Sequence, residues 1–248
     1  NLSSTQGATV TLYAKWTENR LIIKYHLNGG TDVENDNNFQ SGDPCLTQKW
    51  QYTFTTEYGL TNYDTTRVYR TGYKANKYYN TKSDGTGYNL DHDALKTTIQ
   101  IAEAAHVLAD LENGNVEIDI YMIWTPITYT IQYNGNGNTG GSTANSSHTY
   151  DQAKALTANS FSKTGYTFAG WATSATGEVV YNNKQSVINL SSTQGATITL
   201  YAKWKPITYT IKYDGNGNTG GSTANSSHTY DQAKALTANS FSKTGYTF

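Results

Sequence analysis

Hydrophobic and polar residues alternate along several short stretches of the chain, and each of these stretches predicts a β-strand. In residues 8–16, ATVTLYAKW, one face carries Val10, Leu12, Ala14 and Trp16, and the other face carries polar residues and tyrosine. Because successive side chains of a strand point to opposite sides, this period of two predicts a half-buried strand. Similar patterns predict further strands at 117–124, 129–133, 148–150, 165–171 and 178–181.

Between residues 95 and 109 the apolar positions recur every three or four residues, which predicts an amphipathic helix ending near Leu111. Asp91 or Asp93 can cap its N-terminus, and the pair Asn113-Gly114 ends it. The apolar face holds Leu95, Ile99, Ala102, Ala105 and Ala109, with Ile101 and Leu108 at its edge. The predicted order of elements is a hairpin, further strands, this helix and a closing strand, so strands dominate.

Two long segments of the chain occur twice. Residues 1–16 reappear as 189–204 with one substitution, and residues 125–168 reappear as 205–248 with three substitutions. The copies of the second pair start 80 residues apart. Self-similarity of this kind is the signature of a tandem array, in which neighbouring units stack on one another.

The repeats divide the chain into four segments. Residues 1–16 are the closing strand of a truncated repeat, and 17–124 form a long, diverged repeat with two insertions and one helix. Residues 125–204 are one complete short repeat, and 205–248 are the opening half of another. Each junction is one residue followed by proline, which restricts the backbone, so successive repeats are expected to sit close together with little bending freedom.

Aromatic residues recur at fixed positions of the repeat, which indicates core packing. In the long repeat, Tyr78 aligns with Trp171 and Tyr88 aligns with Tyr181. We expect truncation of Trp204 to alanine to cost about 3–5 kcal/mol, the usual value for a buried tryptophan. The residues assigned to the structural core are Trp16, Trp124, Trp171, Trp204, Tyr166 and Tyr181.

Composition and charge exclude several functional classes. The net charge is −1 and 15% of residues are charged, so no basic field exists to bind nucleic acid. No apolar run approaches the roughly 20 residues of a membrane span, so none is expected here. Cys45 is the single cysteine, so no intrachain disulfide is possible and stability is expected from the core or from many repeats stacked together.

Three motifs resemble a known family. GYTFAGW at 165–171, LYAKW at 12–16 and 200–204, and YTIKYDGNG at 209–217 are similar to the Listeria–Bacteroides repeat, the internalin B-repeat family. The resemblance implies the fold class α+β, strand-dominated, with small β-grasp-like units that in tandem would form an elongated rod. It also implies an extracellular location, because this family occurs in secreted and wall-attached bacterial proteins, often adhesins.

No metal site is expected from the sequence. Residues 214–218, DGNGN, are similar to the start of a calcium loop, but Thr219 and Asn225 stand where such a loop needs glycine and glutamate. The sister copy has Asn134 in place of Asp214. We therefore interpret the Asn-Gly pairs as hairpin turns. The five histidines show no metal-ligand spacing.

No catalytic residue or cofactor site is expected either. Cys45 lies in GDPCL, which matches no nucleophile signature, and the chain contains neither a GxSxG motif nor a phosphate-binding glycine loop. An enzymatic function is therefore the weakest of three hypotheses.

A recognition function is the alternative to a purely structural one. Trp50, Tyr52, Tyr58 and Tyr63 fall in or beside the first insertion of the long repeat, residues 39–63. Insertions in repeat arrays map to loops on one face, often the binding face. These four residues are the candidate ligand-binding set for a glycan or a host protein.

The leading hypothesis is a structural stalk or filament segment of a bacterial surface protein, because near-identical copies suit spacing. We expect residues 125–204 to fold autonomously and 205–248 not to. Residues 8–16 are expected to lie beside 207–213 of a neighbouring unit, building a head-to-tail array. That join is either strand donation between copies or a covalent link in a longer chain of one long and two short repeats.

Overall fold

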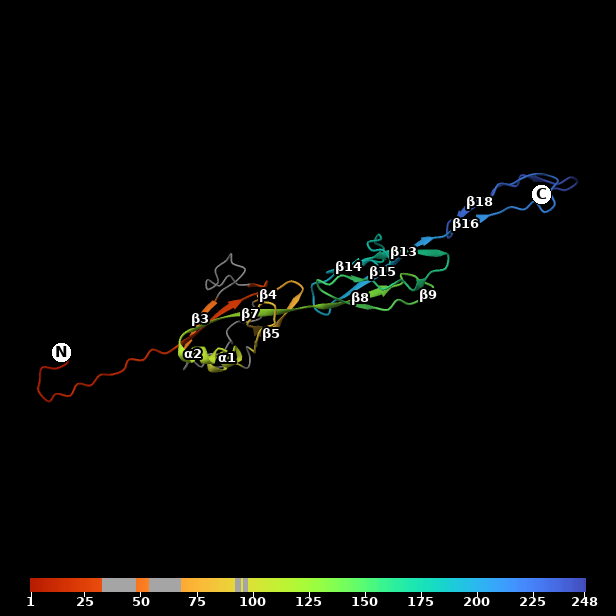
Figure 1. Ribbon diagram of the computed structural model, residues 1–248. Coiled ribbons are helices and arrows are strands. Elements are labelled where there is room, and N and C mark those ends of the chain that lie inside the picture. The colour runs from red at the N-terminus through yellow and green to blue at the C-terminus, as the bar shows by residue number, and fades with distance from the viewer. Residues whose placement is uncertain (33–47, 54–67, 92–94, 96–97) are drawn as a thin grey trace. The chain divides into compact units, whose positions relative to one another are not determined.

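The computed structural model describes residues 1–32, 48–53, 68–91, 95 and 98–248 (Figure 1). The chain divides into two compact units, Asn1–Pro126 and Ile127–Phe248, which are described separately below. Strands make up most of the regular structure in both units, and the strand-dominated character of the predicted fold is confirmed.

The first unit is built on a five-stranded sheet, formed by β1 (Arg20–His26), β3 (Gln48–Thr53), β5 (Tyr73–Asn80), β6 (Asn89–Asp91) and β7 (Val116–Pro126). The strands follow the order β3-β1-β7-β5-β6. The central pair, β1 and β7, is parallel, with Ile23 opposite Ile118. A short antiparallel pair joins β2 (Thr31–Asp32) to β4 (Val68–Tyr69).

Two short helices, α1 (Thr98–Ala104) and α2 (Leu108–Asn113), replace the single continuous helix that the sequence predicts. The break is at His106, whose φ of 59° is left-handed. The His106 amide donates to the Glu103 carbonyl over 3.0 Å, and the Val107 amide donates to the Ala102 carbonyl over 2.8 Å. This pair of bonds is a Schellman motif, which ends α1.

The predicted capping residues do not start a helix among the described residues. Asp91 is the last residue of β6, where its carboxylate accepts a hydrogen bond from Lys77 Nζ over 3.1 Å. Asp93 lies outside the described residues. At the other end, α2 stops at Asn113, before Gly114, as predicted.

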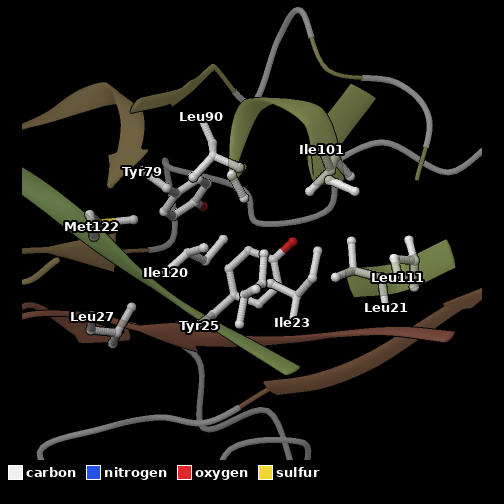
Figure 2. Packing of buried hydrophobic residues seen from close by; sticks show 13 residues of the cluster. Leu21, Ile23, Tyr25, Leu27, Tyr79, Leu90, Ile101, Leu111, Ile120 and Met122 are labelled. Carbon is white, nitrogen blue, oxygen red and sulfur yellow. The ribbon is translucent and has the colours of Figure 1, made fainter. Parts of the chain in front are cut away.

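The core of the first unit lies between the sheet and the helices (Figure 2). Tyr25 and Tyr79 from different strands meet edge to face, with ring centroids 5.4 Å apart. The helices contribute Ile101 and Leu111, both fully buried. Of the predicted apolar face, Ala102 and Ala105 are buried, whereas Ala109 is exposed. The other large buried side chains are Leu21, Ile23, Leu27, Leu90, Ile118, Ile120 and Met122.

The second unit contains a four-stranded sheet, formed by β8 (Thr128–Asn134), β10 (Ser146–Thr149), β13 (Tyr166–Ala172) and β15 (Thr197–Pro206). Its order is β10-β8-β15-β13, and β8 runs parallel to β15 with Ile131 opposite Ile198. These strands correspond to β3, β1, β7 and β5 of the first unit. In both repeats, the first long strand and the last therefore lie side by side. Two further pairs join β9 (Gly140–Gly141) to β12 (Phe161–Ser162), and β11 (Lys154–Ala155) to β14 (Ser186–Val187).

Two local predictions for the short repeat are wrong. Residues 178–181 form no strand, and the pairing there is a single bridge between Tyr181 and Trp171. The Asn134-Gly135 pair does not make a hairpin, because β8 pairs next with β10 across a longer connection. The left-handed φ values of 47° at Asn136 and 79° at Gly137 serve that connection instead.

The long repeat differs from the short one by an extra residue in the bulge of β5. The pairing register of β5 with β7 shifts between Ala75 and Tyr79. This bulge contains more residues than the one in β13, where the register shifts between Phe168 and Gly170. As a result Tyr79, and not Tyr78, takes the place of Trp171 and pairs with Met122. The predicted alignment of Tyr78 is therefore wrong by one residue.

The same shift changes the role of Tyr88. Leu90 pairs with Tyr79 and is fully buried, so it fills the place that Tyr181 has beside Trp171. Tyr88 is half exposed and stacks on His106, with ring centroids 3.9 Å apart. It does not belong to the core.

Residues 205–248 repeat the opening half of the short repeat and form two small sheets. β16 (Thr208–Ile211) pairs with β18 (Ser226–Thr229), and β17 (Gly220–Gly221) pairs with β19 (Phe241–Ser242). No apolar side chain of this segment is buried; Thr223 and His228 are its buried residues. A half repeat lacks the closing strand that would cover its apolar face.

The predicted strand at residues 8–16 is not formed. Residues 1–18 are all exposed, and 8–16 pair with no strand among the described residues. A strand is stabilised by hydrogen bonds to a neighbour, so the alternating pattern alone does not fold this segment.

Candidate functional site

The aromatic residues assigned to the core from sequence occupy five different environments. Trp171 is fully buried in the centre of the second core. Trp124 and Trp204 are partly buried and donate from Nε1 to the carbonyls of Leu27 and Gly135, over 2.8 and 2.9 Å. Their shared role is to bind the last strand to the connection after the first.

The other three core assignments differ. Trp16 is 90% exposed in this structure, which differs from its assignment to the core, and no strand among the described residues lies beside it. Tyr181 is partly buried at the edge of the second core, where its backbone pairs with Trp171. Tyr166 is half-buried and contacts the next repeat rather than the core.

The candidate ligand-binding residues are not gathered into one described site. Trp50 and Tyr52 belong to β3, where their backbones pair with Ile23 and Leu21. They therefore lie on a strand of the main sheet and not in an insertion loop. Tyr58, Tyr63 and Cys45 lie outside the described residues.

An asparagine holds the connection after the first strand of each repeat. Asn136 donates from Nδ2 to the carbonyls of Ala175 and Ala202, both over 2.9 Å. Its left-handed φ suits asparagine, which adopts this conformation more readily than most residues. With the adjacent Trp204 bond to Gly135, it forms what we call the Asn–Trp clasp.

The long repeat contains an equivalent clasp in which the acceptor residues differ. Asn28, with φ of 50°, donates from Nδ2 to the carbonyls of Ser83 and Met122, over 2.8 and 3.0 Å. Trp124 supplies the second bond, to Leu27. Sequence analysis missed this role, although the asparagine stands at the same repeat position in each copy.

A second constellation joins residues 125–204 to 205–248. The Ile207 amide donates to the Gly165 carbonyl over 2.9 Å, and Tyr166 OH donates to Asp231 Oδ2 over 2.8 Å. The rings of Tyr166 and Tyr230 meet edge to face at 5.7 Å. The bond to the Asp231 carboxylate raises the pKa of the Tyr166 phenol, which keeps its proton and remains a donor.

Gly165 is the point of closest approach at this junction. Its φ is +76°, and a Cβ added there would lie 2.3 Å from the Tyr230 ring. Glycine is therefore required both by the backbone and by the neighbouring ring. The pairing of β13 with β15 continues across the repeat boundary, with Tyr166 opposite Pro206.

A hollow of about 620 Å³ lies in the half repeat. Its lining includes Asn216, Phe241 and Tyr246. In the complete repeat, the residue equivalent to Phe241 packs on Trp171 at 6.4 Å. The hollow therefore corresponds to volume that the second half of a repeat fills.

Two segments of the chain match a known family model. Residues 129–203 and 209–248 match the family model of the Listeria-Bacteroides repeat domain. These two segments are Listeria–Bacteroides repeats. The resemblance of their motifs is thereby confirmed, and the family indicates a bacterial surface repeat protein with a surface or extracellular location. A comparison with curated proteins finds no significant match.

The long repeat, residues 17–124, lies outside the matched segments. Its sheet nevertheless has the strand order of the Listeria–Bacteroides repeat at 129–203, with β6 added at one edge. The Asn28 and Trp124 contacts also reproduce the clasp of that repeat. This segment thus shares its strand order and its clasp with the matched repeat at 129–203.

The described residues contain no cluster of side chains suited to a metal ion. Across the described ranges, no three His, Cys, Asp or Glu side chains gather in a way that could hold a metal ion. Asp214 Oδ1 accepts the Asn216 amide over 2.8 Å, as Asn134 Oδ1 accepts the Asn136 amide. The carboxylate of the calcium-like sequence thus serves a local turn. No helix of the described residues is long and apolar enough to cross a membrane.

His148 is the single histidine of the short repeat, and its side chain is buried. It is 1% exposed, its Nε2 lies 3.0 Å from Ser146 Oγ, and its ring stacks on Tyr129 at 5.6 Å. Burial lowers the pKa of His148, and the charge of Lys154 lowers it further. The folded repeat therefore favours the neutral imidazole.

We expect the stability of residues 125–204 to fall as the pH drops through about 6.5, the pKa of an unfolded histidine. Below that pH the unfolded chain binds a proton that the folded repeat resists, because the folded pKa of His148 is lowered. Thermal melts of the full chain at pH 7.5 and 5.0, compared with His148→Gln, would measure this effect. An unchanged pH dependence in the variant would contradict it.

Proposed function

We propose that this chain is a non-enzymatic stalk or filament segment of a bacterial surface protein, in which tandem β-grasp-like repeats form an elongated rod. The observation that carries the proposal is the junction between 125–204 and 205–248. In a rigid spacer the orientation of each repeat relative to the next must be restricted. Several independent contacts hold this junction.

The junction restricts bending in three ways. A main-chain bond joins Ile207 to Gly165, and the strand pairing of β13 with β15 runs across the boundary. A phenol–carboxylate bond and an edge-to-face ring pair add side-chain contacts. Each contact is modest, about 0.5–1.5 kcal/mol for a typical hydrogen bond, but together they fix one orientation.

The internal contacts of the duplicated halves support a structural role. Tyr133 OH lies 3.2 Å from Ser146 Oγ and accepts the Thr157 amide over 2.8 Å. Tyr213 OH makes the same two contacts in the second copy, over 3.0 and 2.8 Å. Each duplication of the whole scaffold lengthens the protein by one repeat, which suits a spacer. An active site, by contrast, does not need an identical copy beside it.

Deletion of residues 125–204 is expected to shorten the molecule by one repeat without unfolding the rest. The deletion joins Trp124 directly to Lys205, which recreates the Trp-Lys-Pro junction found after Trp204. Because β15 has 10 residues, each rising ~3.3 Å, the largest dimension should fall by roughly 30 Å. Small-angle X-ray scattering measures it, and an unchanged dimension would refute the rod.

Recognition through residues 39–63 is the competing function, and a glycan array separates the two. The full chain and its Trp50→Ala variant would be applied to the same array. Absence of binding by both supports the stalk, whereas binding that Trp50→Ala abolishes would favour an adhesin-type module.

A further inference from the structure

The connection after the first strand of the short repeat contains two Asn-Gly pairs in direct succession, Asn134-Gly135 and Asn136-Gly137. Glycine has no side chain to shield its backbone nitrogen, and it gives the backbone wide conformational freedom. The glycine nitrogen can therefore attack the side-chain carbon Cγ of the asparagine before it, which is the first step of deamidation. Whether this happens in the folded repeat depends on the contacts of each asparagine side chain.

The two asparagines use opposite ends of their side-chain amides. Asn134 is exposed and contributes an acceptor, since its Oδ1 accepts the Asn136 amide over 2.8 Å. Asn136 is half-buried and contributes a donor, since its Nδ2 donates to the carbonyls of Ala175 and Ala202, both over 2.9 Å. Deamidation replaces the side-chain nitrogen by an oxygen, so it preserves the contact of Asn134 and removes both contacts of Asn136.

The second copy of this segment shows that a carboxylate is tolerated at the first of the two positions. Asp214 stands where Asn134 stands, and its Oδ1 accepts the Asn216 amide over the same distance of 2.8 Å. The second position is different. An aspartate in place of Asn136 would set a carboxylate, which accepts hydrogen bonds but donates none, against two carbonyl oxygens. The Asn–Trp clasp could not close around it.

We propose that Asn136 is a modification site: the closed clasp protects it from deamidation, and deamidation after the repeat has opened prevents the clasp from closing again. In the closed clasp two hydrogen bonds hold the leaving nitrogen, Nδ2, and the backbone is fixed at a left-handed φ of 47°. Opening of the repeat breaks these bonds and frees the glycine nitrogen to attack. Asn28 of the long repeat, bound to the carbonyls of Ser83 and Met122, is protected in the same way.

The reaction needs no reagent other than water. The Gly137 nitrogen forms a bond to Cγ of Asn136, the bond from Cγ to Nδ2 breaks, and Nδ2 leaves as ammonia with the proton that Gly137 gives up. Water then opens the cyclic imide at either of its carbonyls, which yields aspartate or isoaspartate. Nothing is oxidised or reduced, and the net change is the exchange of ammonia for water. Deamidation at Asn136 therefore limits the lifetime of an opened repeat, whether or not the chain serves as a spacer.

Deamidation rates of the full chain at mildly alkaline pH, with and without denaturant, test the proposal. Tandem mass spectrometry of proteolytic peptides locates the product at each Asn-Gly pair, and the differences at positions 132 and 134 distinguish the two copies. We expect denaturant to accelerate the reaction at Asn136 by about tenfold more than at Asn134, because two hydrogen bonds of Nδ2 are lost at Asn136. Equal acceleration at the two asparagines would overturn the proposal.

A matched pair of variants measures the consequence of deamidation at each position. Asn134→Asp should leave hydrogen exchange of the β15 amides unchanged, because Asp214 makes the equivalent contact in the second copy. Asn136→Asp should raise that exchange by about tenfold or more, because both bonds of Nδ2 are lost. Aspartate adopts a left-handed φ nearly as readily as asparagine does, so the difference reports on the side chain. Equal exchange in the two variants would show that deamidation does not open the clasp.

Discussion

Replacing Trp171 with alanine is expected to lower the free energy of unfolding of the 125–204 repeat by about 3–5 kcal/mol. The indole is fully buried, and its ring lies 4.8 Å from that of Tyr133 and 4.9 Å from that of Phe168. Truncation removes these contacts and leaves a cavity in a core assembled from few large residues. Hydrogen exchange of the β8 and β15 amides measures the loss in this repeat alone.

Alanine substitutions of two other tryptophans serve as comparisons for Trp171→Ala. Trp16→Ala should leave the stability of the single copy within about 0.5 kcal/mol of the parent, because Trp16 is 90% exposed. Trp204→Ala should cost less than Trp171→Ala, because Trp204 is only partly buried, although it loses the bond to Gly135. A cost below about 1 kcal/mol for Trp171→Ala would contradict its central place in the core.

Gly165→Ala is expected to release residues 205–248 from their fixed orientation on the preceding repeat. An alanine at this left-handed φ costs about 1–2 kcal/mol in the backbone. Its Cβ would also lie 2.3 Å from the Tyr230 ring, which must move away. Displacement of Tyr230 removes the ring pair with Tyr166 and strains the adjacent bond to Asp231.

Gly245→Ala is the matched control, because Gly245 has the same place in the repeat and a φ of +78°, with open space around its Cβ position. Both variants have the backbone cost, and Gly165→Ala alone has the clash. NMR relaxation of the 205–248 amides reports how independently this segment tumbles. Equal tumbling in the two variants would show that the Tyr230 contact does not hold the junction.

The sequence by itself determined the internal duplication and most of the long strands. The alternating patterns at 117–124 and 129–133 lie within β7 and β8, and the 165–171 pattern overlaps β13. These features are visible because a half-buried strand needs side chains of opposite character on its two faces. The motifs also identified the Listeria–Bacteroides repeat, which the family comparison confirmed.

Only the tertiary structure decided which patterned segments find partners. Residues 8–16 have the pattern of β15, yet Trp16 is exposed, and no strand in the described part of the chain lies beside it. One extra residue in a bulge places Tyr79 in the core instead of Tyr78. The acceptors of Asn136 stand 39 and 66 residues away in the chain. Local pattern records which face of a segment is apolar, whereas pairing, register and hydrogen-bond acceptors depend on residues that folding brings together from distant parts of the chain.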